Sequence, residues 1–215
     1  MTDPGPSEWS VPGQVGVGPW DGQWPAGDRW DPELLEHGDR RNVVDAYRYW
    51  RREAVAQDLA RRAHPFHVAI ENLGHDHNIG TVVRTANAFG AAGVHIVGRR
   101  RWNRRGAMVT DRYLSLHHQP GPAELVAFAR DHGLALVAVD NLPGAVRLEE
   151  TTLPRSCMLL FGAEGPGLSP EITEAADLAV SIAQFGSTRS VNAGVAAGIV
   201  MHAWIRDHAN LADAW

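Results

Sequence analysis

Residues 156–176 read SCMLLFGAEGPGLSPEITEAA and contain three structural signals in succession. The apolar run at 156–162 is typical of a strand that is buried on both faces. Three glycines and a proline then indicate a loop. Ser169 followed by Pro170 is typical of the start of a helix. Strand, loop and helix in this order predict one unit of an α/β fold.

The same alternation continues on both sides of this stretch. Strands are expected at 66–73, 93–98, 134–140, 156–162 and 178–183, and helices at 78–90, 122–133, 169–176 and 190–208. Alternating strands and helices predict an α/β fold with a mostly parallel sheet flanked by helices. Ligands of such sheets bind at the carboxyl ends of the strands, so we expect a site in the loops that follow them.

The N-terminal part of the chain differs from this pattern. Residues 1–30 are rich in glycine, proline and acidic side chains and lack apolar periodicity, which predicts a disordered or loosely docked tail. Four tryptophans either anchor this tail or have no fixed role: Trp9, Trp20, Trp24 and Trp30. Residues 31–64 are expected to form a helical extension that is split at Gly38. The main domain is expected at 65–208, followed by a short tail at 209–215.

The charge of the chain is unevenly distributed. The formal net charge is −5, and the first 40 residues carry eight acidic and two basic side chains. The remainder is therefore close to neutral, which leaves a nucleic-acid partner possible. All basic residues are arginine, a residue that suits bidentate contacts to phosphate but that also fits a codon bias.

Membrane segments and disulfides are not expected. No apolar run reaches the ~20 residues that a membrane span needs, and the N-terminus lacks the basic and apolar regions of a signal peptide. The single cysteine, Cys157, lies in an apolar run and is expected to be a buried hydrophobic residue. These features predict a cytoplasmic protein without a membrane partner.

The loop that follows the strand at 156–162 is the first candidate site. Gly162, Gly165 and Gly167 allow a ligand to approach the backbone closely, and Glu164 lies among them. Their spacing differs from the G-x-G-x-x-G fingerprint of dinucleotide-binding proteins, which disfavours a nucleotide-dependent oxidoreductase. A tight turn without a ligand is the alternative explanation of this loop.

Two further segments could complete a site. The sequence HNIGTVVRTANAFG at 77–90 predicts a helix that carries Arg84 among small residues, either as a solvated charge or beside a pocket. Asn78 is the candidate N-cap of this helix. Near the C-terminus, Ser190 and Asn192 precede a helix rich in small residues, and they either cap it or face a ligand.

Three motifs taken together resemble one known family. They are N-x-G-x-x-x-R-x-A-x-x-F-G at 78–90, F-G-x-E-x-x-G-L-S at 161–169 and S-V-N-x-x-V-A-A-G-I at 190–199. In this order they are similar to the motifs of the SpoU, or TrmH-like, branch of the SPOUT methyltransferases, and the resemblance covers residues 65–208. It implies an α/β fold with a deep C-terminal trefoil knot, and a homodimer. It also implies transfer of a methyl group from S-adenosylmethionine to a ribose 2′-hydroxyl of tRNA or rRNA.

The resemblance also assigns roles to individual residues. The catalytic positions of the family are matched by Asn78, Arg84, Glu164, Ser190 and Asn192. The cofactor contacts are matched by Gly162, Ile182 and Val191. The chain departs from the family after Ile182, where Ala183-Gln184-Phe185 replaces the usual Pro-Met and changes the wall of the adenine pocket.

A charged arginine and a basic loop provide the expected contacts to RNA. A guanidinium is effectively always charged, so we expect Arg84 to bind the phosphate and the 2′-oxygen rather than to act as the base. The loop GRRRWNRR at 98–105 is expected to bind phosphates and to stack a base on an aromatic ring, although a solvated basic loop is the alternative. The residues concerned are Arg99, Arg100, Arg101, Trp102, Arg104 and Arg105.

Other features carry less information. The histidine pairs His75 and His77, and His117 and His118, lack a further ligand at familiar spacing, so no metal site is predicted. The helical extension either adds RNA contacts or covers a dimer. A non-catalytic RNA-binding protein that keeps the fold is the alternative function, and only the altered segment after Ile182 favours it.

Overall fold

The computed structural model describes residues 16–72, 77–163 and 165–215. The chain divides into two compact units, a smaller one that extends to Asp58 and includes Trp215, and a larger one at 59–214. None of the described helices is both long enough and apolar enough to cross a membrane.

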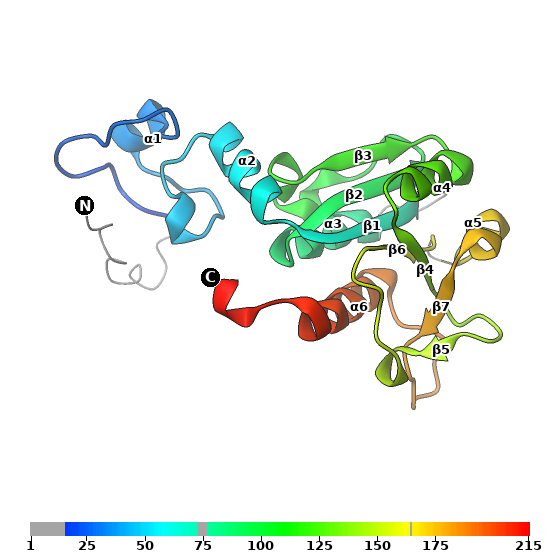
Figure 1. Ribbon diagram of the computed structural model, residues 1–215. Helices are drawn as coiled ribbons and strands as arrows, with labels where there is room; N and C mark the ends of the chain where they lie inside the picture. Colours follow the sequence, from blue (N-terminus) through cyan, green and yellow to red (C-terminus); the bar gives the residue numbers. More distant parts are fainter. Residues whose placement is uncertain (1–15, 73–76, 164) are drawn as a thin grey trace. The chain divides into compact units, whose positions relative to one another are not determined.

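A parallel sheet forms the centre of the larger unit (Figure 1). Its seven strands within the described residues are β1 (His64–Asn72), β2 (Ala91–Gly98), β3 (Leu116–Gln119), β4 (Ala135–Val139), β5 (Val146–Arg147), β6 (Cys157–Phe161) and β7 (Leu178–Ser181). They are ordered β3-β2-β1-β6-β4-β7-β5, and every neighbouring pair is parallel. At the centre, Phe66 lies opposite Cys157 and Ile70 opposite Phe161. The prediction of a parallel α/β sheet is confirmed.

Helices cover both faces of this sheet (Figure 1). On one face, α3 (His77–Ala88) and α6 (Ala193–His208) bury apolar side chains such as Val82 and Trp204. On the other face, α4 (Pro122–Asp131) and α5 (Pro170–Ala175) pack on a second apolar cluster that includes Leu136. Because both faces are covered, β6 is buried throughout, and burial raises the pKa of the Cys157 thiol to about 12. Cys157 is therefore the buried hydrophobic residue that the sequence predicts.

Several element boundaries differ from the sequence prediction. The last helix begins at Ala193 rather than Ser190, because the Asn192 side chain accepts hydrogen bonds from the first backbone N–H groups of α6. Asn78, the predicted cap of α3, lies inside the first turn of that helix instead. The strands β3 and β5 are missing from the prediction because they are short and contain partly or fully exposed residues.

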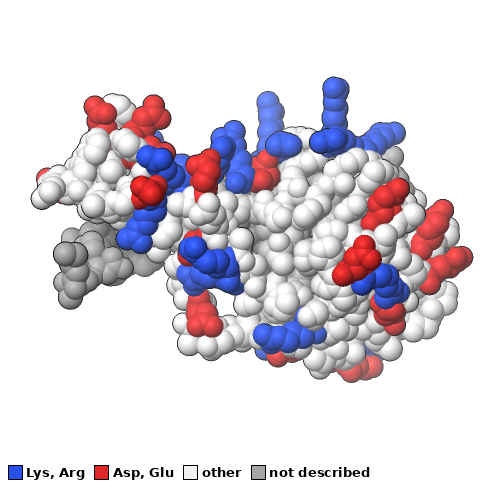
Figure 2. Space-filling model, turned by 45° about the horizontal axis from the view of Figure 1, so that its top comes forward, with Lys and Arg blue, Asp and Glu red and all other residues white. Residues whose placement is uncertain are grey.

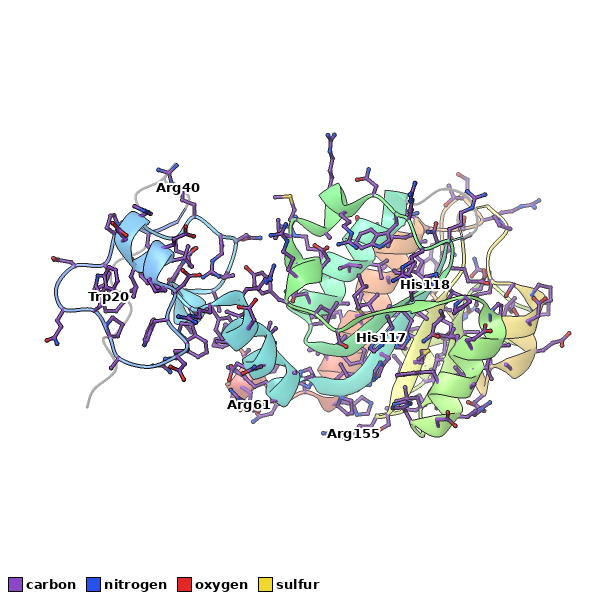
Figure 3. All side chains as sticks on the ribbon, turned by 90° about the horizontal axis from the view of Figure 1, so that it is seen from above. Trp20, Arg40, Arg61, His117, His118 and Arg155 are labelled. Atoms are coloured by element: carbon purple, nitrogen blue, oxygen red, sulfur yellow. The ribbon has the colours of Figure 1, made fainter. Side chains whose placement is uncertain are left out.

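The smaller unit contains an aromatic cluster. The rings of Trp20 and Trp30 pack edge to face with centroids 5.7 Å apart, and those of Trp30 and Trp50 are 6.3 Å apart. The guanidinium of Arg29 lies 4.8 Å from the ring centroids of both Trp30 and Trp50. Figure 3 labels Trp20 in this cluster. Trp9 lies outside the described residues.

The described part of the N-terminal segment takes part in this unit. Within residues 16–30, the backbone N–H of Val17 donates to Asp39 and that of Trp20 donates to Leu35. The helical extension is also discontinuous: α1 (Pro32–His37) ends at Gly38 as predicted, and the next α-helix, α2 (Arg52–Arg62), begins only after an irregular segment. That segment holds Asp39, a fully buried carboxylate that accepts hydrogen bonds from the guanidinium of Arg41 and from the backbone N–H of Tyr49. Burial opposes ionisation of Asp39, but these hydrogen bonds hold its pKa below the ordinary value.

Histidines gather on the sheet face that α4 covers. His67 on β1 and His95 on β2 are joined by a 3.0 Å hydrogen bond between Nδ1 and Nε2. The amide of Gln119 lies 3.0 Å from the other ring nitrogen of His95. The ring of His117 on β3, labelled in Figure 3, stacks on His95 with centroids 4.6 Å apart. Phe128 of α4 contacts the rings of all three histidines.

Burial keeps this histidine cluster uncharged. Desolvation by burial, together with smaller repulsion from neighbouring histidines, lowers the pKa of His95 to about 3 and that of His67 to about 4. The pKa of His117 is also lowered, first by burial and then by His132. Within the described residues, no three His, Cys, Asp or Glu side chains are grouped as metal ligands.

Candidate functional site

A cavity of about 360 Å³ lies at the carboxyl ends of β4, β6 and β7; we call it the main cavity. Its walls come from the end of β4, the loop after β6, and the loop and helix start after β7. The structure brings together here five of the eight residues to which the resemblance assigns a catalytic or cofactor role: Gly162, Ile182, Ser190, Val191 and Asn192. This position, beyond the carboxyl ends of parallel strands, is where ligands of such sheets bind.

The glycine-rich loop after β6 closes on itself. The backbone N–H groups of Ala163 and Gly167 each donate to the carbonyl oxygen of the other residue, at 3.1 and 3.0 Å. A Cβ at Gly162 would lie 2.0 Å from the carbonyl carbon of Gly167, so no side chain fits there. The loop is thus a tight turn and also a wall of the main cavity, which reconciles the two explanations weighed from the sequence. Glu164, the motif acid, lies outside the described residues.

Two residues that the sequence analysis missed hold the loops of the cavity in place. The carboxylate of Asp140, directly after β4, accepts a hydrogen bond from the backbone N–H of Leu168 at 3.2 Å. The side-chain amide of Asn141 donates to the carbonyl oxygen of Arg189 at 2.7 Å. One dipeptide therefore connects the loop after β6 with the loop after β7. The sequence signal that could have identified these two residues is their position directly after a buried strand, where ligand sites of parallel sheets lie.

Asn192 connects the cavity with α3. Its Oδ1 accepts from the backbone N–H groups of Gly194 and Val195, and its Nδ2 donates to Oδ1 of Asn78 at 2.9 Å. Asn78 is 8% exposed and does not line the cavity itself. Capping and a site role are therefore compatible for Asn192, and Asn78 is its buried partner.

Arg84 lies on the exposed side of α3 and is not part of the lining of the main cavity. No described residue forms a hydrogen bond or ion pair with its guanidinium. Two of the small residues on its face, Gly80 and Thr81, lie against other described segments of the chain. A Cβ at Gly80 would lie 2.7 Å from Cα of Gly106, and Thr81 packs against Gly194 of α6.

The basic loop after β2 packs on the same helix. A 3₁₀ turn at Arg104–Ala107 approaches α3 through the backbone contact of Gly80 with Gly106. The buried side chain of Asn72 donates to the carbonyl oxygens of Arg99 (2.7 Å) and Arg101 (3.0 Å), which fixes the start of the loop. Asn72 is a third residue that the sequence analysis missed.

The arginines of this loop are exposed, and Figure 2 shows arginine side chains side by side along one edge of the larger unit. The exposed members are Arg99, Arg100, Arg101, Arg104 and Arg105. Trp102 is half-buried, and the guanidinium of Arg104 lies 5.6 Å from its ring centroid. Arg104 also pairs with Asp111 at 3.1 Å, so its charge is partly neutralised. The remaining arginines carry most of the positive charge of the loop.

Residues 65–202 match the sequence profile of the SpoU rRNA Methylase family. The chain belongs to this family. The match covers every part of the candidate site described above: α3, the basic loop, and the walls of the main cavity up to Ala196. The resemblance stated from the three sequence motifs is confirmed.

Members of the SpoU family among known proteins align with the same part of the chain. A Borreliella burgdorferi protein named tRNA (guanosine(18)-2'-O)-methyltransferase is 29% identical over 136 residues, which cover 62% of each chain. The present chain thus spans about three fifths of the length of that relative. The A. aeolicus TrmH/SpoU tRNA modifying enzyme has the same fold, with a TM-score of 0.64 and 24% identity. The alignment covers 73% of the present chain and 81% of that enzyme.

A third SpoU relative was solved with its cofactor. The SpoU methyltransferase AviRb from Streptomyces viridochromogenes, in complex with AdoMet, gives a TM-score of 0.59 at 27% identity. The alignment covers 66% of the present chain and 58% of AviRb. The trefoil knot that the resemblance implies stays a prediction.

Proposed function

We propose that this protein is an S-adenosylmethionine-dependent RNA methyltransferase that acts on a ribose 2′-hydroxyl of tRNA or rRNA. The observation that carries the proposal is the main cavity, which the second and third sequence motifs enclose at the carboxyl ends of three parallel strands. The Borreliella relative is named for this reaction on tRNA, and AviRb was solved with AdoMet, which supports the proposal. We place this activity in the cytoplasm, where tRNA and rRNA are found.

The main cavity fits such a cofactor in size and chemistry. Its volume of about 360 Å³ is in the range of small-molecule sites. Ile182, Val191 and Ala196 offer apolar contacts for a purine ring, while Gly162 and Gly167 present backbone groups. We therefore assign Gly162, Ile182 and Val191 as cofactor-binding residues. S-adenosylmethionine, when bound, supplies a methyl group already activated on a sulfonium, so the protein mainly has to align its substrate.

Arg84 is the residue that we assign to the substrate. Its guanidinium is exposed and has no partner within the described part of the chain, so it is available to a phosphate and a 2′-oxygen. As a permanent cation it stabilises negative charge that develops on the oxygen, rather than accepting the proton. Asn192 and Asn78 fix the start of α6 against the start of α3, while Ser190 remains exposed at the rim of the cavity. The proton leaves through that phosphate, through water or through Glu164, which lies outside the described residues.

The basic loop is proposed to bind the RNA backbone. Arg99, Arg100 and Arg101 are exposed, and the buried amide of Asn72 fixes the backbone that carries them. Arginine side chains in this arrangement suit phosphate contacts, and the half-buried ring of Trp102 offers a face for a base. The loop packs directly on the helix of Arg84, so RNA held here is led toward that residue.

A homodimer is the assembly that we propose. α6 carries Val195 (54% exposed) and Ile199 (39% exposed) four residues apart, and Val191 precedes the helix with 37% exposure. An exposed apolar row on a well-packed helix is typical of a surface that a partner covers. Sedimentation velocity should give a dimer for the wild type and a monomer for Val195→Arg. A wild-type monomer at assay concentrations would contradict this part of the proposal.

Transfer of a labelled methyl group from S-adenosylmethionine to total RNA tests the function. We expect transfer by the wild type, loss of about 100-fold or more in Arg84→Ala, and a large loss in Arg84→Lys, because lysine lacks the bidentate fork. Arg206→Ala, which removes an exposed arginine near the end of α6, should keep wild-type turnover. RNA binding without any transfer would favour the non-catalytic alternative, and full activity of Arg84→Ala would refute the assigned role.

A further inference from the structure

The side chain of Gln184 contains an unsatisfied acceptor beside the main cavity. Its Oε1 is buried and has no hydrogen-bond partner in the structure. Gln184 lines the main cavity and also a neighbouring cavity of about 360 Å³, the side cavity, which Arg189 and Thr188 line as well. A buried acceptor that stays unpaired costs about 1–3 kcal/mol, so native proteins rarely leave one without a partner.

The backbone around Gln184 is held on both sides. The N–H of Ala183 donates to both carboxylate oxygens of Glu149, at 3.2 Å each. Farther along the loop, the carbonyl oxygen of Arg189 accepts from Asn141 at 2.7 Å. The position of Gln184 in the wall is therefore fixed, whereas its amide oxygen is not held by any described residue. The terminal torsion of a glutamine side chain is broad, so the amide can rotate about it when a ligand binds.

The surroundings indicate which donor the amide meets. The main cavity is lined by apolar side chains as well as by Gln184, among them Ile182 and Val191, which suit the faces of a flat heteroaromatic ring. A side-chain amide is complementary to the edge of adenine, because its oxygen accepts from the 6-amino group and its nitrogen donates to a ring nitrogen. We propose that Gln184 recognises the adenine of the cofactor through the 6-amino group. This inference rests on the proposed function, since it assumes that the cavity binds S-adenosylmethionine.

The proposal also explains a departure from the family. The chain has Ala183-Gln184-Phe185 where the family usually has Pro-Met, so apolar contact is replaced by an amide in the wall of the site. The replacement introduces a polar group that no described residue satisfies. A ligand with a donor at this edge satisfies it.

Calorimetry with two ligands tests the contact without any turnover. The ligands are S-adenosylhomocysteine and its analogue in which hydrogen replaces the 6-amino group. In the wild type we expect the analogue to bind about tenfold more weakly, as for the loss of one hydrogen bond. In Gln184→Met the two ligands should bind equally, at about the affinity of the analogue for the wild type. Gln184→Glu keeps an acceptor and should retain the preference for the amine.

The controls separate failure of this inference from failure of the proposed function. Thr188→Val, on the same loop but lining only the side cavity, should keep the tenfold difference. Circular dichroism verifies that each variant is folded. If Gln184→Met retains the tenfold difference, the contact does not exist, although the function stands. If the folded wild type binds neither ligand, the proposed function itself fails.

Discussion

Mild acid should destabilise the larger unit through its buried histidines. His95 is fully buried, and burial lowers its pKa from 6.5 to about 3. In the unfolded chain the same ring binds a proton as soon as the pH falls below about 6.5. Between these two values the unfolded state binds more protons than the folded state, so stability decreases as the pH falls. As the pH is lowered from neutral, the free energy of unfolding is therefore predicted to start decreasing near the ordinary pKa of histidine.

The size of the effect follows from the pKa of His95. One pH unit corresponds to about 1.4 kcal/mol for one proton. Lowering the pH from about 7 to about 5 therefore reduces the free energy of unfolding by about 2 kcal/mol through His95. His67, whose pKa is lowered to about 4, is less buried, and its contribution after solvent screening is about 1 kcal/mol. The sum of about 3 kcal/mol is a large part of the stability of a typical domain.

Urea unfolding followed by circular dichroism at several pH values measures this loss. His95→Gln removes the titrating ring and keeps a hydrogen-bonding side chain, so about 2 kcal/mol of the difference between neutral and acidic pH should disappear. His202→Gln, at an exposed position of α6, is the matched control for removing one histidine outside the cluster. An unchanged pH dependence in His95→Gln would refute the reasoning, because the cluster would then not carry the effect.

Three further predictions test the packing and the surface. Gly162→Ala places a Cβ 2.0 Å from the backbone of Gly167 and should cost about 3 kcal/mol in thermal or urea unfolding, whereas Gly186→Ala, with open space around it, should be nearly neutral. Gly80→Ala places a Cβ 2.7 Å from Gly106 and should lower the free energy of unfolding by about 2 kcal/mol. Gly198→Ala, whose Cβ meets only an ordinary 3.9 Å contact inside a helix, should raise it by about 0.5 kcal/mol or more. Equal effects of the two substitutions would contradict the close approach of the basic loop to α3. Replacing Arg99, Arg100 and Arg101 by glutamate should weaken RNA binding and reduce its salt dependence in a filter-binding assay. An unchanged dependence of the binding constant on salt concentration would show that the loop does not contact the RNA.

The sequence was sufficient for the features that depend on local composition. Apolar runs and glycine or proline boundaries predicted the central strands, because strands covered on both faces are apolar throughout. Short strands escaped this reasoning, since β3 holds two adjacent histidines and β5 has only two residues, both exposed. The packing of Gly106 against Gly80 on the small polar face of α3 could not be predicted, because one sequence does not show which segment lies there.

Features that join distant segments were not predictable from the sequence. Asp140 and Asn141 act on residues 28 and 48 positions further along the chain, and neither belongs to a motif. The histidine cluster draws its members from three strands, so its rings become neighbours only in the folded sheet. The aromatic cluster of the smaller unit has the same origin, as tryptophans in a glycine-rich segment meet rings that lie after α1.

The hydrogen bond between Asn78 and Asn192 has a consequence for the order in which the site is made. Its two residues are 114 positions apart, so on the ribosome the first is synthesised long before the second. α3 and the basic loop therefore leave the ribosome while the segment at 190–196 does not yet exist. Under the proposed function, a nascent chain would expose its arginines to RNA before it has a complete wall for the methyl donor. Methylation would then begin only when the last helix has docked, and a prematurely terminated chain would bind RNA without modifying it.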